Sequence, residues 1–221
     1  MSDIIDRNLD DPDAHYDTLC RVTGQLFLSW ARLETNLAAN LRQFLTFTMT
    51  PGFRGRRFPY DVSAAIFGSA RFKTTRTMIT DLVKVTSGNQ DVMAFLNTFF
   101  THLGNIEDLR NKLAHQTLTP TTNPVSETWQ LSDFVTTKHF GSVKRWTIAP
   151  QAIHYAAQDT VTAGTKFLGI LVPHVFDRYH TLPFNLEQPP WLYKPSMLAL
   201  QPRKRGPSPQ VPPPPPPPSA G

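Results

Sequence analysis

The sequence lacks a second cysteine and a long apolar run, and these two absences limit the compartments in which the protein is expected. Cys20 has no second cysteine among the 221 residues with which to form a disulfide, which favours a reducing compartment. Nowhere do about 18 apolar residues follow one another, and the acidic start, MSDIIDRNLDDPD, lacks the apolar segment of a signal peptide. We therefore expect a soluble cytoplasmic protein that does not enter a membrane.

Motifs for metals and nucleotide cofactors are also missing. The sequence has no Cys-x-x-Cys, no His-Glu-x-x-His and no histidine spacing suited to zinc. It has no P-loop and no Gly-x-Gly-x-x-Gly. Any chemistry is therefore expected to proceed without a metal or another cofactor.

Proline is concentrated at the C-terminal end. Of the 21 prolines, 14 lie from Thr181 onward, seven of them in the run VPPPPPPP. This composition predicts a disordered tail over 181–221, which is either a polyproline II ligand for a partner protein or only a solubilising extension. The tail has four basic residues and one acidic residue, +3, so the net charge of +5 leaves +2 for the rest. A domain so close to neutral is not expected to bind duplex DNA strongly.

Apolar residues spaced by three and four predict helices over most of the region 19–180. The first helix is long and amphipathic and begins at Leu19. Further helices are expected after a cap at Asp61 or Ser63, then over about 71–85, 91–115 and 151–176. The segment TLTPTTNP is predicted to be a loop, and the alternating residues of about 127–148 a β-hairpin. These elements predict a mainly α fold.

The predicted architecture is an up-and-down four-helix bundle with a small β-hairpin inserted before the last long helix. Residues 1–18 are expected to form a flexible N-terminal segment, 19–180 the bundle, and 181–221 the tail.

The stretch LRNKLAHQ ends the most periodic helix and contains the residues of greatest chemical interest. Helical spacing places Asn111 and His115 about 40° apart on one face, together with Asp108 and away from the core. Arg110 lies nearer the buried side, where a guanidinium needs a carboxylate. Glu34 on the first helix is the expected partner of Arg110, although a solvated position for Glu34 is the equal alternative.

These residue types suit the cleavage of a phosphodiester. His115 lies in the last turn of its helix, where the dipole and Asp108 favour the imidazolium, and histidine serves as a general acid or base near neutral pH. Arg110 can bind a phosphate and stabilise a five-coordinate transition state. RNA supplies its own nucleophile in the 2′-hydroxyl, so no metal is required.

The run Arg110-Asn111-Lys112-Leu113-Ala114-His115 resembles the Arg-x4-6-His motif of the HEPN superfamily, including the polar residue that often follows the arginine. The predicted order of helices is also similar to that family. The resemblance implies a helical bundle whose protomers pair so that two motifs line one cleft, and the metal-independent ribonuclease activity found in toxin, phage-defence and RNA-processing systems. Arg110, Asn111 and His115 carry over as catalytic residues, whereas Glu34 does not.

The segment FRGRRF interleaves arginines with aromatic residues. Arg54, Arg56 and Arg57 would suit contact with the RNA backbone while neighbouring rings stack on bases. A solvated loop anchored to the core by its aromatic residues is the alternative reading.

Two functions remain open from the sequence. In the first, a homodimer cleaves single-stranded RNA by transesterification: His115 exchanges the proton, Arg110 holds the scissile phosphate, and Asn111 orients the histidine or contacts the phosphate. In the second, a non-catalytic bundle uses Asn111, Asp108 and His115 as a polar contact to a second copy or to a protein partner. Motif residues saturated inside one protomer would favour the second function.

Overall fold

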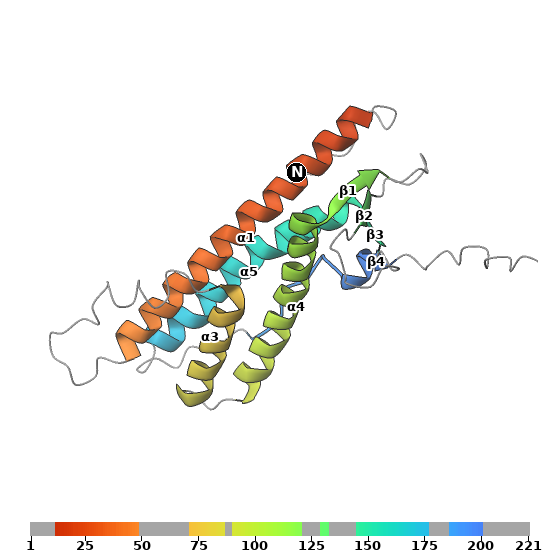
Figure 1. Ribbon diagram of the computed structural model, residues 1–221. Coiled ribbons are helices and arrows are strands. Elements are labelled where there is room, and N and C mark those ends of the chain that lie inside the picture. Colours follow the sequence, from red (N-terminus) through yellow and green to blue (C-terminus); the bar gives the residue numbers. More distant parts are fainter. Residues whose placement is uncertain are drawn as a thin grey trace, which may run out of the picture.

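The computed structural model describes residues 12–48, 71–86, 90–120, 129–132, 145–176 and 186–200. Four helices dominate this part of the chain: α1 (Pro12–Thr48), α3 (Phe72–Thr86), α4 (Gln90–His115) and α5 (Pro150–Phe176) (Figure 1). The prediction of a mainly α, bundle-like fold is confirmed. The predicted short helix near residue 61, the arginines Arg54, Arg56 and Arg57, and the proline run near the C-terminus lie outside the described residues.

Helix α1 forms because its apolar residues recur every three or four positions and are buried as one stripe. The stripe consists of Leu19, Val22, Leu26, Trp30, Leu33, Leu37 and Leu41. The helix begins at Pro12, a residue favoured in a first turn, so the prediction of a flexible segment through residue 18 is wrong for 12–18. The apolar pattern missed this start because Tyr16 and Asp17 are exposed and extend no stripe.

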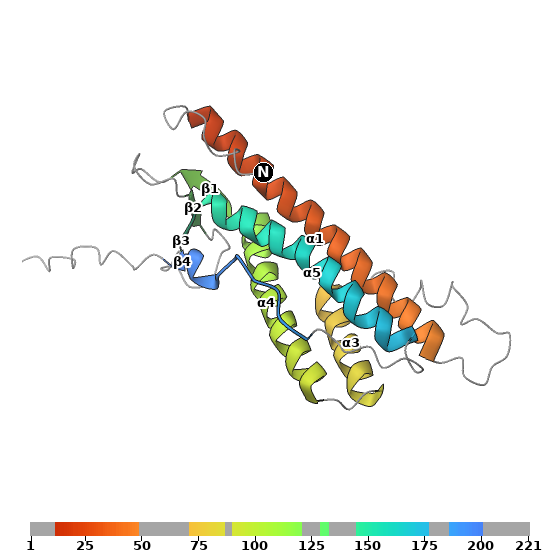
Figure 2. The same ribbon diagram turned by 180° about the vertical axis from the view of Figure 1, so that it is seen from behind.

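The four described helices do not alternate strictly in direction. Helix α5 lies beside α1 along most of its length, and both run the same way, with α4 antiparallel to them (Figures 1 and 2). Helix α3 starts beside the middle of α1, where the Phe72 N–H meets the Glu34 carboxylate. Among the described helices α1, α3 and α5 therefore share one direction, and the short helix predicted after Asp61, on which the up-and-down order also depends, lies outside the described residues.

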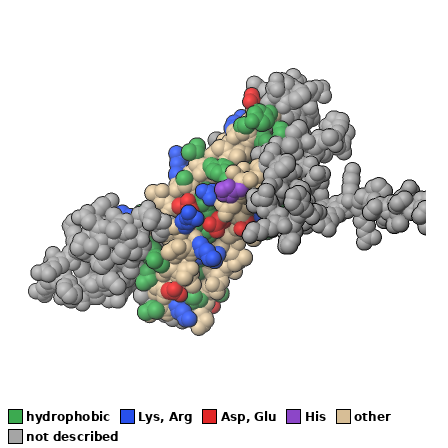
Figure 3. Space-filling view, viewed as in Figure 1, with side chains coloured by type: hydrophobic (Ala, Val, Ile, Leu, Met, Phe, Trp, Pro, Cys, Tyr) green, Lys and Arg blue, Asp and Glu red, His purple; other side chains and the backbone are tan. Residues whose placement is uncertain are grey.

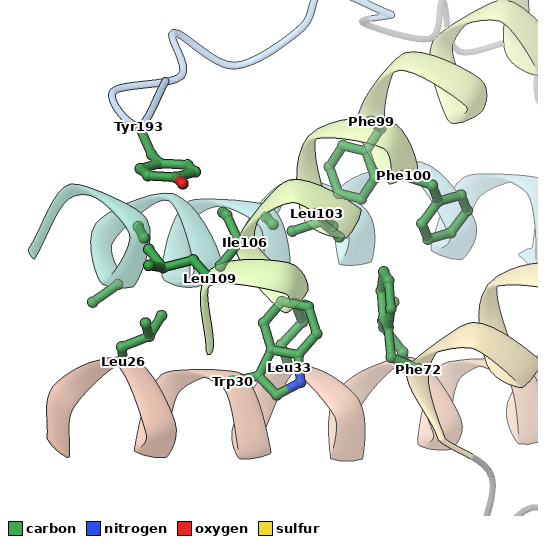
Figure 4. Close-up of a cluster of buried hydrophobic side chains, with 14 of the residues drawn as sticks. Leu26, Trp30, Leu33, Phe72, Phe99, Phe100, Leu103, Ile106, Leu109 and Tyr193 are labelled. Carbon is green, nitrogen blue, oxygen red and sulfur yellow. The ribbon is translucent and has the colours of Figure 1, made fainter. Parts of the chain in front are cut away.

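An aromatic cluster joins the four helices. Phe99 is fully buried, and its ring centroid lies 5.6 Å from that of Phe100 and 6.1 Å from that of Phe167. Phe72 of α3 packs edge-on against Trp30 of α1 at 5.0 Å (Figure 4). Aromatic pairs at these separations add to the stabilisation from apolar burial. The cluster fixes α4 against its three neighbours.

A four-stranded antiparallel sheet caps one end of the bundle, in the order β1 (Thr117–Pro120), β2 (Trp129–Ser132), β3 (Arg145–Ile148), β4 (Ala199–Leu200). The predicted hairpin is confirmed in its paired residues, in which Trp129 faces Ile148 and Ser132 faces Arg145. The prediction of a loop over TLTPTTNP is wrong for β1. This strand is at the edge of the described sheet, where a proline at its end is tolerated.

Residues 186–200, called here the C-terminal strap, fold against the helices. Figure 2 shows the strap running along α4 toward the sheet, where it ends in β4 after a 3-10 turn at Pro195–Met197. Tyr193 is 1% exposed and faces the cluster that contains Ile106 and Leu109 (Figure 4). The prediction of a disordered tail from residue 181 is therefore wrong for 186–200. Its aromatic residues bury enough apolar surface to offset the high proline content.

Candidate functional site

The Arg-Asn-x3-His motif occupies the last two turns of α4. Arg110 is half-buried, and its Nη1 donates a hydrogen bond to Oδ1 of Asn111 at 2.9 Å. The guanidinium also lies over the ring of Phe27 on α1, with Cζ 5.6 Å from the centroid. These two contacts hold the arginine at one place on the surface of the bundle. Its Nε is buried without a hydrogen-bond partner in the described part of the chain.

His115 is the last residue of α4 and is exposed. The backbone N–H of Gln116 still donates to the carbonyl of Lys112 at 2.9 Å, and β1 begins at Thr117. The sheet therefore follows the helix almost at once, which limits how far the last turn can move. The imidazole is open to solvent at a point held by both the helix and the sheet.

A second aromatic ring lies on the other side of the motif. Nζ of Lys112 is 5.6 Å from the ring centroid of Trp146, which is half-buried on β3. Arg110 and Lys112 are two residues apart, so they project about 200° apart around the helix axis. Asn111 and His115 lie between them and are flanked by a cation–aromatic pair on each side.

Glu34 does not pair with Arg110. Among the described residues these two side chains form no salt bridge, and Oε1 of Glu34 instead accepts a hydrogen bond from the Phe72 N–H at 3.4 Å. The first amides of a helix lack partners within it and form the positive end of its dipole, so a carboxylate is favoured there. The predicted Glu34–Arg110 contact is wrong because α3 provides the partner for Glu34.

Acidic and basic side chains mix along the exposed face of α4 (Figure 3). Asp108 is exposed, and Glu107 beside it is half-buried. Burial raises the pKa of Glu107, and the nearby carboxylates of Glu34 and Asp108 raise it further, against the opposing effect of Arg76 and Arg110. The motif is therefore next to a cluster of near-balanced charge and not to a uniformly basic surface.

A buried polar pair that the sequence analysis did not single out fastens the strap. Asp159 of α5, 2% exposed, accepts hydrogen bonds from Nε2 of His102 at 2.9 Å, from the Leu192 N–H at 3.0 Å and from the Tyr193 N–H at 2.9 Å. The His102 ring stacks on Trp191 with centroids 4.2 Å apart.

The Asp159 carboxylate is thus used by donors from the protein itself, which makes this pair a structural clamp. A signal was present in the sequence, because both residues interrupt the apolar stripe of a helix. His102 lies between Phe99 and Ile106, and Asp159 follows Ala156 by three residues. A polar residue in a buried stripe needs a partner, and these two provide it for each other.

Within the described ranges no group of three histidine, cysteine, aspartate or glutamate side chains is placed to hold a metal ion. None of the described helices is long and apolar enough to span a bilayer. Comparison of the chain with known protein families, with curated proteins and with solved structures finds no match. The resemblance to HEPN proteins therefore rests on the motif and on the helical character of the chain.

Proposed function

We propose that this chain is a metal-independent endoribonuclease that cleaves single-stranded RNA at the C-terminal end of α4. The observation that carries the proposal is the position of the Arg110 guanidinium, which is held by Asn111 and by Phe27 of α1. Arg110 lies on the same two turns of α4 as the exposed His115. A positioned cation and an accessible imidazole are the two groups that such a reaction needs.

In the proposed reaction His115 removes the proton from a ribose 2′-hydroxyl, and the 2′-oxygen attacks the adjacent phosphorus. Arg110 stabilises the additional negative charge on the five-coordinate phosphate. The bond to the 5′-oxygen then breaks, and that oxygen takes up a proton from water or from a second imidazole. The products are a 2′,3′-cyclic phosphate and a 5′-hydroxyl. A homodimer with two motifs in one cleft would supply the second imidazole, and a role in toxicity or phage defence belongs to the same proposal.

A non-catalytic interaction module is the second candidate, and one observation favours it. Nη1 of Arg110 and Oδ1 of Asn111 already satisfy each other inside one protomer, and both residues are half-buried. In this alternative the pair stiffens the end of α4, and the exposed Asp108 and His115 contact a second copy or a protein partner.

The test is an RNA-cleavage assay in the presence of EDTA with the full chain. We compare the wild type with His115→Ala and Arg110→Ala, and use His154→Ala and the exposed Arg32→Ala as matched controls. Loss of a general acid or base, or of a donor that stabilises the transition state, lowers the rate by about 100-fold or more. We expect that loss in the two motif variants alone, with cyclic phosphate ends on the products.

The absence of cleavage across a broad panel of single-stranded RNAs by folded wild-type protein would overturn the ribonuclease. Sedimentation of the same proteins then tests the second candidate. A dimer of the wild type that is weakened by His115→Ala would support the interaction module.

A further inference from the structure

We propose that Trp146 and Lys112 form a subsite for one unpaired nucleotide of single-stranded RNA, next to the histidine of the motif. This inference rests on the proposed ribonuclease function and specifies its substrate: a strand with a base free to leave its stack. Trp146 would bind the base and Lys112 the adjoining phosphate.

The position of the subsite follows from the chain order. Lys112 lies between Asn111 and His115, and its ammonium group is 5.6 Å from the centre of the Trp146 ring. An aromatic ring on the sheet is therefore beside the same helical turn that presents the imidazole. A nucleotide bound at that ring would place its phosphate at the end of α4.

The ring is held by the sheet. Trp146 faces Leu131 on β2 and Leu200 on β4, so its strand has a paired neighbour on each side. The side chain is half-buried, which leaves part of it open to a ligand. A rigid, partly exposed aromatic ring binds a flat base with little loss of conformational freedom.

The lysine explains how the site would select nucleic acid. In the free protein the ammonium lies over the Trp146 ring as a cation–π pair. A base that stacks on the ring displaces the ammonium, which then pairs with the phosphate of the same nucleotide. A base in a duplex is already stacked and paired, so it cannot make this exchange without being extruded.

On the far side of Asn111 and His115, Arg110 over Phe27 forms a second cation–aromatic pair. Arg110 is the residue proposed to hold the scissile phosphate, and the subsite at Lys112 would bind another nucleotide of the same strand on the opposite side of Asn111 and His115. The two pairs give the strand a path across the end of α4 instead of a single contact point.

The experiment measures binding of a fluorescein-labelled single-stranded RNA of mixed sequence, and of the same strand annealed to its complement, to the full chain carrying His115→Ala. Into that background we introduce Trp146→Ala, Trp146→Phe, Lys112→Glu or, as a matched control from the last turn of α3, Lys84→Glu. Loss of one base–aromatic stack is expected to weaken binding about 5- to 100-fold. Trp146→Phe should retain most of the affinity, Lys112→Glu should weaken it, and Lys84→Glu should leave it near that of the background.

Cleavage by Trp146→Ala with the motif intact separates binding from chemistry. We expect KM to rise while kcat changes little, and the preference for single strands over duplex to shrink. Folded Trp146→Ala with unchanged Kd and KM would overturn the subsite even if the wild type cleaves RNA. A wild type that shows no RNA cleavage, together with loss of RNA binding in Trp146→Ala and Lys112→Glu, would support the subsite and reject the ribonuclease function. Should Trp146→Ala not fold, unchanged binding by Lys112→Glu rejects the proposal.

Discussion

Replacement of Asp159 by alanine should release the C-terminal strap. The carboxylate is buried and accepts hydrogen bonds from the His102 ring and from the N–H groups of Leu192 and Tyr193. In Asp159→Ala these three donors lose their acceptor, and the bonds of the His102 ring and the Tyr193 N–H are buried. Each buried donor must then stay unpaired or reach water, which favours movement of the strap away from α5.

The expected loss of stability in Asp159→Ala follows from the burial of Asp159 and His102. A buried donor left without an acceptor costs about 1–3 kcal/mol, within a total stability of about 5–15 kcal/mol for an ordinary domain. Because three donors lose their acceptor, we expect Asp159→Ala to lower the free energy of unfolding by about 4 kcal/mol. Asp159→Asn keeps one acceptor oxygen but turns the other into a donor, and should cost about 2 kcal/mol.

Urea unfolding followed by circular dichroism measures both values, and Asp81→Asn on the exposed face of α3 is the matched control. Hydrogen exchange at the Leu192 and Tyr193 amides reports the strap itself and should accelerate in Asp159→Ala. A loss of less than about 1 kcal/mol in Asp159→Ala, with both amides still protected, would refute the reasoning. The strap would then be held by its aromatic residues and not by the carboxylate.

Three further changes test the charges and the core. Glu107→Gln should stabilise the protein at neutral pH, because the pKa of Glu107 is raised in the folded protein and its ionised form therefore opposes folding. This gain in the free energy of unfolding should vanish as the pH falls below 4.5, the ordinary pKa of glutamate. Burial raises the pKa of Tyr193 to about 12 from 10.0, so stability should fall as the pH rises from about 10 to about 12, and Tyr193→Phe should lack that loss in alkaline unfolding experiments. Phe99→Ala should cost about 3–5 kcal/mol in urea unfolding, whereas the exposed Leu28→Ala should change little.

The helices were predictable from the sequence where an apolar stripe is long and uninterrupted. The residues from Leu19 to Leu41 are such a stripe, and they lie in α1 as expected. The spacing of apolar residues does not say which helix covers which stripe, so it could not predict the parallel pairing of α1 with α5. Nor does this spacing say in which direction α3 runs relative to α1.

The strap was missed because its proline content outweighed two aromatic residues that pack against the helices, Trp191 and Tyr193. Composition describes a segment on average, but docking depends on particular anchors. The motif at the end of α4 was located correctly as a helical feature, since its residues depend on local spacing. The predicted contact of Glu34 with Arg110 depended on how distant helices pack. The spacing of residues in the sequence could not reveal that the N-terminus of α3 would bind the Glu34 carboxylate instead.

The pairing of α1 with α5 has a consequence for the order of events during synthesis. About 100 residues separate Thr48 from Pro150, and the ribosome needs roughly 5–20 s to add them at about 5–20 residues per second. During that interval the apolar stripe of α1 has no α5 to cover it. Such non-local pairing slows folding, and until α5 is made the apolar stripe of α1 is a surface that a chaperone would recognise.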